Sequence, residues 1–243
     1  DPDHPRGRQP ARLTGRRTGR TPMTTTVLLT CFEPFGGDPE NASEQAVALL
    51  AGTWRDEDVR LLTARLPVSF TGAGPALDEA LAPHSPDAVV AVGEAGGRRA
   101  VTPETTARNV MDARIPDNDG GQPHSEAIDP TGPTSLPTRL DVEGIVRACV
   151  ADGIAATVSH DAGAFVCNLV LHHLLRVTDV PAGFVHVPAV RTSGRATVGS
   201  ETAPSADSPA FDSEPALTLE ECARALGHAV RAAAAAATTA RTG

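Results

Sequence analysis

The sequence predicts an α/β fold with a largely parallel sheet. From residue 26 onward, short apolar runs typical of buried strands alternate with segments whose apolar residues recur at helical spacing. Such alternation indicates parallel strands that are joined by helical crossovers. Glycine-rich and polar loops follow several of the strand-like runs, and ligands bind beyond the carboxyl ends of the strands in such sheets. We therefore expect a ligand site where these loops gather.

The first half of the chain contains five predicted elements. The run TVLLTCF (26–32) predicts a buried strand, because it is apolar and the turn-rich EPFGGDPEN follows it. The segment 42–51 has helical spacing, with Asn41 or Ser43 as its N-cap. The other elements are a strand over 58–68, a short helix over 73–83 that Pro83 ends, and a strand over 87–97 that runs into glycines.

The second half begins with an irregular segment. Residues 98–137 are polar and rich in Pro, Asp and Gly, which predicts loops. Regular structure then returns. The predicted elements are a helix over 138–153 that ends at Gly153, strands over 154–160 and 182–188, a helix over 164–176, and a final helix over 216–237 with Thr218 as its cap.

Composition sets the domain boundaries and excludes some classes of protein. Residues 1–22 carry six arginines among Pro, Gly and Thr. They have too little apolar surface to offset the entropy of ordering, so we predict a disordered Arg-rich extension before a domain over 23–243. The Pro- and Ser-rich segment 201–215 predicts a flexible loop. The net charge of -9 argues against nucleic-acid binding, and no apolar run approaches the roughly 20 residues that cross a membrane.

Motifs for cofactors and metals are missing from the sequence. The glycine-rich stretches at 35–38 and 93–99 match neither the P-loop pattern nor the glycine pattern of dinucleotide-binding folds. No cysteines or histidines have metal-ligand spacing, so no metal site is predicted. The cysteines are too thinly spread for a disulfide framework, which indicates reduced thiols in a cytoplasmic protein. They are Cys31, Cys149, Cys167 and Cys222.

A cysteine at the start of a predicted helix is the strongest candidate for chemistry. The N–H groups at a helix N-terminus favour a thiolate at Cys167 and could hold an oxyanion. The alternative is an inert core cysteine, since free cysteine is among the most buried residue types. His186 favours a nucleophile, because its strand would deliver an imidazole to the same sheet edge, where it could take the thiol proton. The acids that could orient this imidazole are Glu94, Glu104, Asp112, Asp117 and Asp119.

Four segments resemble, in order and spacing, the motifs of one enzyme family. The segments LLTCFEPFGGDPEN (28–41), GEAGGRRAVTPETTARNVMDARIPDNDG (93–120), SHDAGAFVCNLVLHHLL (159–175) and GFVHVP (183–188) are similar to those of pyroglutamyl peptidase I, also called pyrrolidone carboxyl peptidase. The resemblance implies a single-domain three-layer α/β/α sandwich with a mostly parallel, twisted sheet. It also implies a cofactor-free cytoplasmic cysteine peptidase, often a homotetramer, that removes an N-terminal pyroglutamyl residue from peptides.

The resemblance also implies roles for individual residues. Cys167 matches the nucleophile, His186 the general base, and Glu104 the acid that orients the histidine. Phe32 and Phe35 match aromatic residues that sandwich the lactam ring. The backbone near Glu94 and Val166 could form hydrogen bonds with the lactam, and such pairing rejects analogues that lack its polar groups. The other residues implied to line the site are Phe165, beside Val166, and Arg114, which matches a position near the oxyanion and is a candidate electrostatic stabiliser.

Two positions in the segments that form the implied site depart from the family pattern. Cys31 stands where glycine is usual, and its side chain could crowd the ring pocket. Glu94 stands where glutamine is common, and a carboxylate facing the pocket could weaken binding or alter the pKa of the thiol. These departures motivate an alternative hypothesis, a non-catalytic lactam-binding or regulatory protein on the same fold. A nucleoside phosphorylase-like enzyme would share the architecture, but it needs a phosphate site that the sequence does not show.

Overall fold

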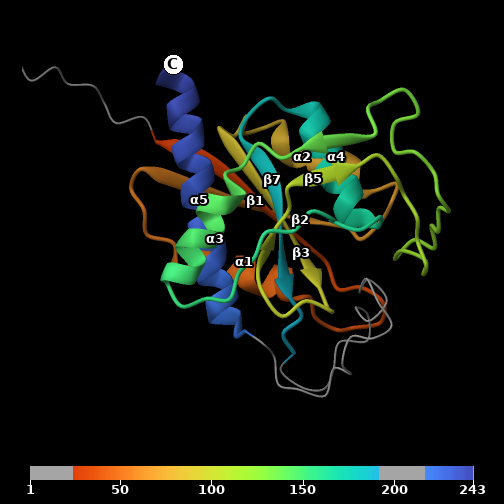
Figure 1. The fold of residues 1–243 in the computed structure, drawn as a ribbon, viewed down its shortest axis with the longest axis horizontal. Helices are drawn as coiled ribbons and strands as arrows, with labels where there is room; N and C mark the ends of the chain where they lie inside the picture. The colour runs from red at the N-terminus through yellow and green to blue at the C-terminus, as the bar shows by residue number, and fades with distance from the viewer. Residues whose placement is uncertain (1–23, 192–216, 243) are drawn as a thin grey trace, which may run out of the picture.

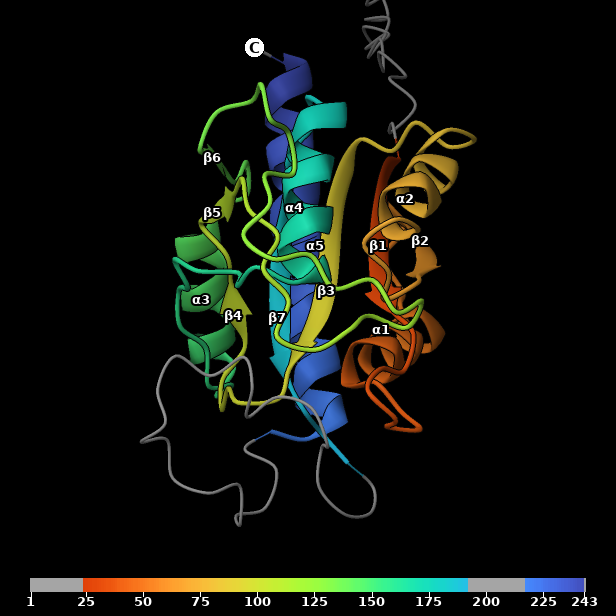
Figure 2. The ribbon, with the colours of Figure 1, turned by 90° about the vertical axis from the view of Figure 1, so that its right-hand side faces the viewer.

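A five-stranded sheet forms the centre of the computed structural model, which describes residues 24–191 and 217–242 (Figure 1). Four strands are parallel, and the short fifth strand runs antiparallel at one edge. Figure 2 shows the strands side by side. In spatial order they are β2 (Val59–Leu66), β1 (Thr25–Phe32), β3 (Ala88–Ala95), β7 (Ala182–Pro188) and β4 (Thr102–Pro103).

Helices cover both faces of this sheet and complete three layers, which confirms the predicted α/β/α sandwich (Figure 1). One apolar cluster joins α1, α3 and α5 to one face, and a second joins α2 and α4 to the other. Because successive residues of a strand point to opposite faces, Cys31 packs in the first cluster and Phe32 in the second. The helices are α1 (Ala42–Thr53), α2 (Ala73–Leu81), α3 (Val142–Ala151), α4 (Val166–Val177) and α5 (Leu219–Thr242).

Two of the predicted helix caps are present in the structure. The Asn41 side chain accepts a hydrogen bond from the Ser43 N–H at the start of α1. Thr218 Oγ1 accepts from the Glu221 N–H, and the Glu221 carboxylate accepts from the Thr218 N–H, which forms a reciprocal capping box before α5. Each cap satisfies N–H groups that a helix leaves without partners, a contribution of about 1 kcal/mol.

Three expectations differ from the structure. Residues 154–160 do not form a strand, because they pair with the segment after β3 only through isolated bridges at Ala156 and Ser159. The segment 98–137 is not wholly irregular, since it contains β4 and both strands of a small second sheet, β5 (Thr106–Arg108) and β6 (Ser135–Pro137). The final helix extends to Thr242, five residues past its predicted end, because its alanines continue the helix.

Parts of the sequence-based domain prediction lie outside the described residues. These are the extension 1–22 and the loop 201–215. None of the helices in the described part of the chain is long and apolar enough to cross a membrane.

Burial of the four thiols predicts a loss of stability at high pH. Burial raises the pKa of Cys31, Cys167 and Cys222 to about 12 and that of Cys149 to about 11. The unfolded chain therefore releases thiol protons from about pH 9, while the folded chain retains them, and the chain has no lysine or tyrosine that titrates there. We expect the free energy of unfolding to fall as the pH rises above 9, by up to about 1.4 kcal/mol per pH unit for each thiol.

Urea denaturation of the reduced protein between pH 7.5 and 11 measures this dependence. Cys222→Ala should reduce the slope, because it removes one of the four contributions. A free energy of unfolding that stays level from pH 8 to 11 would contradict the prediction.

Candidate active site

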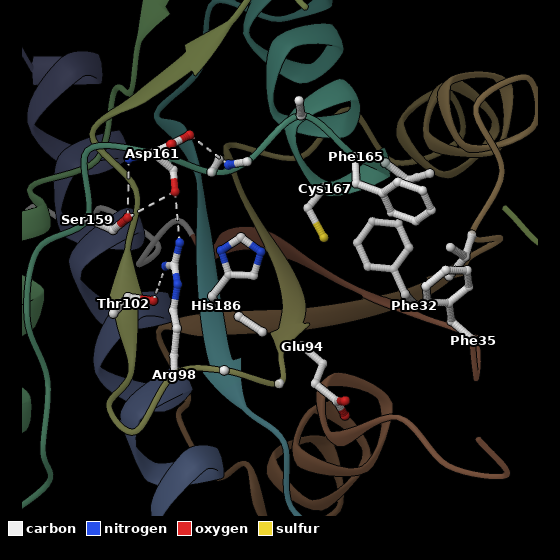
Figure 3. Close-up of a pocket in the computed structure, with 18 of the residues that line it drawn as sticks. Phe32, Phe35, Glu94, Arg98, Thr102, Ser159, Asp161, Phe165, Cys167 and His186 are labelled. Atoms are coloured by element: carbon white, nitrogen blue, oxygen red, sulfur yellow. Dashed lines mark hydrogen bonds between the residues drawn. The ribbon is translucent and has the colours of Figure 1, made fainter. Parts of the chain in front are cut away.

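The carboxyl ends of three strands and the start of one helix surround a cavity of about 640 Å³ (Figure 3). Parallel strands end at the same edge of a sheet, so residues far apart in the sequence meet there. The structure brings all nine residues proposed from the sequence to this region. Those that line the cavity are Phe32, Phe35, Glu94, Arg114, Phe165, Val166, Cys167 and His186, and Glu104 lies buried behind His186.

Cys167 is the second residue of α4, so the N-terminus of the helix faces the cavity. The capping residue, Phe165, offers no side-chain acceptor to the first turn. The N–H groups of this turn are therefore available to an anion at the thiol or at a bound carbonyl oxygen. This placement agrees with the position predicted from the sequence.

Gly93 brings the thiol close to the sheet. A Cβ atom at this position would lie 2.8 Å from Cys167 Sγ and 2.8 Å from the Phe184 ring. Gly93 is also the register partner of His186 on the neighbouring strand. Because neighbouring strands lie about 4.8 Å apart, the thiol above Gly93 is adjacent to the imidazole. Figure 3 shows both side chains directed into the same part of the cavity.

We expect Gly93→Ala to reduce turnover by about 10- to 100-fold, because the added methyl group must displace Cys167 Sγ or the Phe184 ring. Steady-state kinetics with a reporter substrate whose turnover requires the Cys167 thiol measures the loss of turnover. Gly52→Ala is the matched control, since a Cβ there has no neighbour within 4 Å. Equal activities of the two variants would contradict the close approach of the thiol to β3.

A buried carboxylate holds the imidazole. Glu104 Oε1 lies 2.7 Å from His186 Nδ1, with side chains that are 0% and 5% exposed. The Glu104 N–H donates to the Phe184 carbonyl, which fixes the acid beside β7. Among the five acids that the sequence leaves open, this one contacts the histidine. Asp117, by contrast, accepts backbone N–H groups within its own loop and from Phe70.

The electrostatics of the site favour a neutral thiol and a neutral imidazole at rest. Burial lowers the pKa of His186 despite the Glu104 carboxylate. Burial opposes ionisation of Glu104, but its hydrogen bond with His186 and the charge of Arg98 lower its pKa overall. Burial, followed by the charge of Glu104, raises the pKa of Cys167 to about 12. These effects on the pKa of Cys167 thus outweigh the stabilisation of a thiolate expected from the helix N-terminus.

Arg98 is a site residue that the sequence reasoning missed. Its guanidinium donates to Glu104 Oε1 at 2.5 Å, to Thr102 Oγ1, and to the Asp161 carbonyl at 2.8 Å. It therefore links the acid to the segment that leads into α4 (Figure 3). The available signal was its place after AGG at the end of a buried strand, on the edge where a site was expected.

Aromatic rings form an apolar slot beside the thiol (Figure 3). The Phe35 and Phe165 rings are tilted, with centroids 5.1 Å apart. Phe70, which the sequence reasoning also missed, packs edge-on against Phe165 at 5.1 Å. Phe32 lies at the base, 6.3 Å from Phe184. The slot presents flat apolar faces to a small ring.

The two departures from the family pattern do not obstruct this slot. The Cys31 thiol points to the opposite face of the sheet, where it donates to the Ala64 carbonyl at 3.6 Å, so the expected crowding is wrong. The Glu94 carboxylate points away from Cys167 and His186 (Figure 3). It accepts hydrogen bonds from the Ala42 N–H and from Arg191. Arg114, the proposed electrostatic stabiliser, is exposed where it lines the cavity.

The chain is similar to known peptidases in sequence and in structure. It matches the family model described as pyroglutamyl peptidase over residues 25–236. A pyrrolidone-carboxylate peptidase of Pseudomonas fluorescens (strain SBW25) is 47% identical over 165 residues, which cover 67% of this chain and 78% of the relative. The corresponding peptidase of Bacillus subtilis (strain 168) is 40% identical over 173 residues, which cover 69% and 80%.

Solved structures agree with these matches. The crystal structure of Bacillus amyloliquefaciens pyroglutamyl peptidase I has a TM-score of 0.75 at 36% identity and covers 88% of this chain and 98% of its own. Pyrrolidone carboxyl peptidase from Thermococcus litoralis has a TM-score of 0.77 at 31% identity, with coverage of 90% and 97%.

These matches, with the fold and the thiol beside an imidazole, define the protein as a cysteine peptidase. The chain belongs to the pyroglutamyl peptidase family. The resemblance drawn from the sequence is thereby confirmed, and the comparisons give no support to a non-catalytic protein.

Proposed function

We propose that Cys167, His186 and Glu104 hydrolyse the bond after an N-terminal pyroglutamyl residue. His186 accepts the proton of the Cys167 thiol as the sulfur attacks the pyroglutamyl carbonyl carbon. The ionised Glu104 can only accept a hydrogen bond, so it places the proton of the neutral imidazole on Nδ1 and leaves Nε2 as the base. The imidazolium that forms is then stabilised by the adjacent carboxylate.

The intermediates follow from the same groups. The N–H groups at the start of α4 stabilise the negative carbonyl oxygen, with Arg114 as an additional positive charge near the opening. Return of the proton from His186 to the leaving amine breaks the amide bond and leaves a thioester on Cys167. Water then attacks the thioester as His186 removes its proton, which releases pyroglutamate and restores the thiol.

The aromatic slot accounts for recognition of a lactam. Phe32, Phe35 and Phe165 bind the flat, uncharged ring, whereas the ammonium of an ordinary N-terminus would lose hydration there without a partner. Glu94 and Val166 line the cavity, which supports pairing of backbone groups near them with the lactam N–H and C=O.

The observation that carries this proposal is the buried Glu104–His186 pair beside the thiol at the helix N-terminus. The test compares pyroglutamyl, prolyl and glutamyl amide reporters, with and without a reducing agent. We expect cleavage of the pyroglutamyl reporter alone, in reducing conditions. Equal cleavage of the prolyl reporter would contradict recognition of the lactam.

Location and assembly are further parts of the proposal. Family membership and the scattered cysteines support a cytoplasmic enzyme, and the family resemblance supports a homo-oligomer, namely a tetramer. We propose that the protein acts on pyroglutamyl peptides without a cofactor and without contact with nucleic acid or membrane. Light scattering on the purified chain tests the tetramer, and a monomeric mass would contradict it.

A further inference from the structure

A buried ionic cluster lies in the wall of the cavity, beyond the three catalytic candidates. The Arg191 guanidinium donates to both oxygens of Glu94, at 2.8 and 2.6 Å, and to Asp38 Oδ2 at 2.9 Å. The side chains of Arg191, Asp38 and Glu94 are 6%, 5% and 10% exposed. All three residues line the cavity.

The cluster joins three separate segments around the aromatic slot. Arg191 follows β7, which carries His186, and Glu94 lies near the end of β3, next to Gly93. Asp38 belongs to the loop that also carries Phe35. Glu94 extends the connection to α1, because it accepts the Ala42 N–H at 2.6 Å. One guanidinium thus fixes the relative positions of the segments that form the slot.

The charges of the cluster depend on one another. Two buried carboxylates face a single guanidinium, and the N-terminus of α1 adds a partial positive charge beside Glu94. Hydrogen bonds and charge from Glu94 and Asp38 raise the pKa of Arg191 despite its burial. Without the guanidinium, two like charges would remain in a site shielded from water, which is strongly unfavourable.

We propose that Arg191 is a positioning residue for the substrate cavity, which neutralises Glu94 in the cavity wall and ties the loop of Phe35 to β3 and β7. The proposal rests on the proposed function for its kinetic consequences only. It gives a reason why this chain can hold a carboxylate at position 94, where the resemblance implies glutamine: Arg191 neutralises the additional charge.

The consequences of losing Arg191 differ from those of losing a catalytic group. The loop with Phe35 loses its tie, so the lactam binds less tightly. The charge of Glu94, now without its counter-ion, also opposes ionisation of Cys167 more strongly, in addition to the charge of Glu104. The other charged or titratable groups near the thiol, Arg98 and His186, are unchanged by the substitution.

The test uses Arg191→Gln, Glu94→Gln and the double variant. Arg224→Gln is the matched control, since it removes an arginine of α5 from an exposed ion pair with Asp152, the residue that follows α3. For Arg191→Gln we expect KM for a pyroglutamyl amide to rise about tenfold or more with a smaller change in kcat. The alkylation rate of Cys167, followed by mass spectrometry, should shift to higher pH. The double variant should have a lower KM than Arg191→Gln, because it also removes the charge of Glu94, but a KM above the wild-type value, because Asp38 still lacks the guanidinium.

The outcomes distinguish charge compensation by Arg191 from a role in packing alone. The proposal would be overturned if Arg191→Gln changed KM by less than about twofold and left the pH dependence of the Cys167 alkylation rate unchanged. A double variant as impaired as Arg191→Gln would also overturn it, because that result would assign Arg191 a packing role. If Arg191→Gln does not fold, a folded and active double variant supports charge compensation, and failure of both variants overturns it. A wild-type protein without peptidase activity would contradict the proposed function, and the alkylation profile would still test Arg191.

Discussion

Cys167→Ala is expected to lower turnover of a pyroglutamyl amide by on the order of 10⁴-fold or more. The substitution removes the sulfur that forms the thioester and leaves the Glu104–His186 hydrogen bond in place. The residual rate would come from the helix N-terminus and the aromatic slot alone. Steady-state kinetics with a fluorogenic pyroglutamyl amide measures the loss, and binding of a pyroglutamyl product should persist.

Cys31→Ala is the matched control for this experiment. Cys31 directly precedes Phe32 of the aromatic slot in the sequence, but its side chain packs on the opposite face of the sheet. We expect this variant to retain activity. Loss of turnover in Cys31→Ala together with full turnover in Cys167→Ala would reverse the assignment of the nucleophile.

Glu104→Gln is expected to have the next largest effect, a loss in kcat of about 10²- to 10⁴-fold. The amide keeps the shape of the acid but no longer stabilises the imidazolium that forms during attack. It also leaves Arg98 without its carboxylate partner. The same change should lower the pKa of Cys167, because the charge of Glu104 raises that pKa alongside burial.

The substitution Glu104→Gln should make Cys167 ionise more easily and yet lower turnover, and these opposite effects make the variant informative. Alkylation of Cys167 should begin at lower pH than in the wild type, while turnover falls. Ser159→Ala provides a control beside the same acid, because it removes a hydroxyl that forms a hydrogen bond with Glu104 but keeps both charges of the ion pair between Glu104 and Arg98. A Glu104→Gln variant with wild-type kcat would contradict the role of the acid in supporting His186.

Much of the fold could be predicted because its central strands are nearly continuous apolar runs. β1, β3 and β7 are buried on both faces, so their sequences differ clearly from the surrounding loops. The segment 154–160 has a similar composition, but it meets only isolated partners beside the edge strand. A segment with the composition of a strand forms one only when another strand pairs with it along its length. Whether such a strand is present cannot be read from the local sequence pattern.

The site was predictable where position along the chain determines it. Cys167 and His186 stand at a helix start and near a strand end, and both places follow from local patterns. Glu104 could be singled out only by resemblance, since the loop holds several acids. Arg98 and Arg191 were missed because their partners are set by tertiary contacts, such as the 97-residue separation of Arg191 from Glu94. The direction of the Glu94 side chain depends on those contacts too.

The most direct test of the central claim is alkylation of the reduced wild-type protein with iodoacetamide, with activity and site occupancy followed in the same samples. We predict that pyroglutamyl hydrolysis falls in proportion to labelling of Cys167. We also expect 2-pyrrolidone, as a lactam of the size of the aromatic slot, to slow both labelling and loss of activity. Full hydrolytic activity in protein whose Cys167 is completely alkylated would contradict the account.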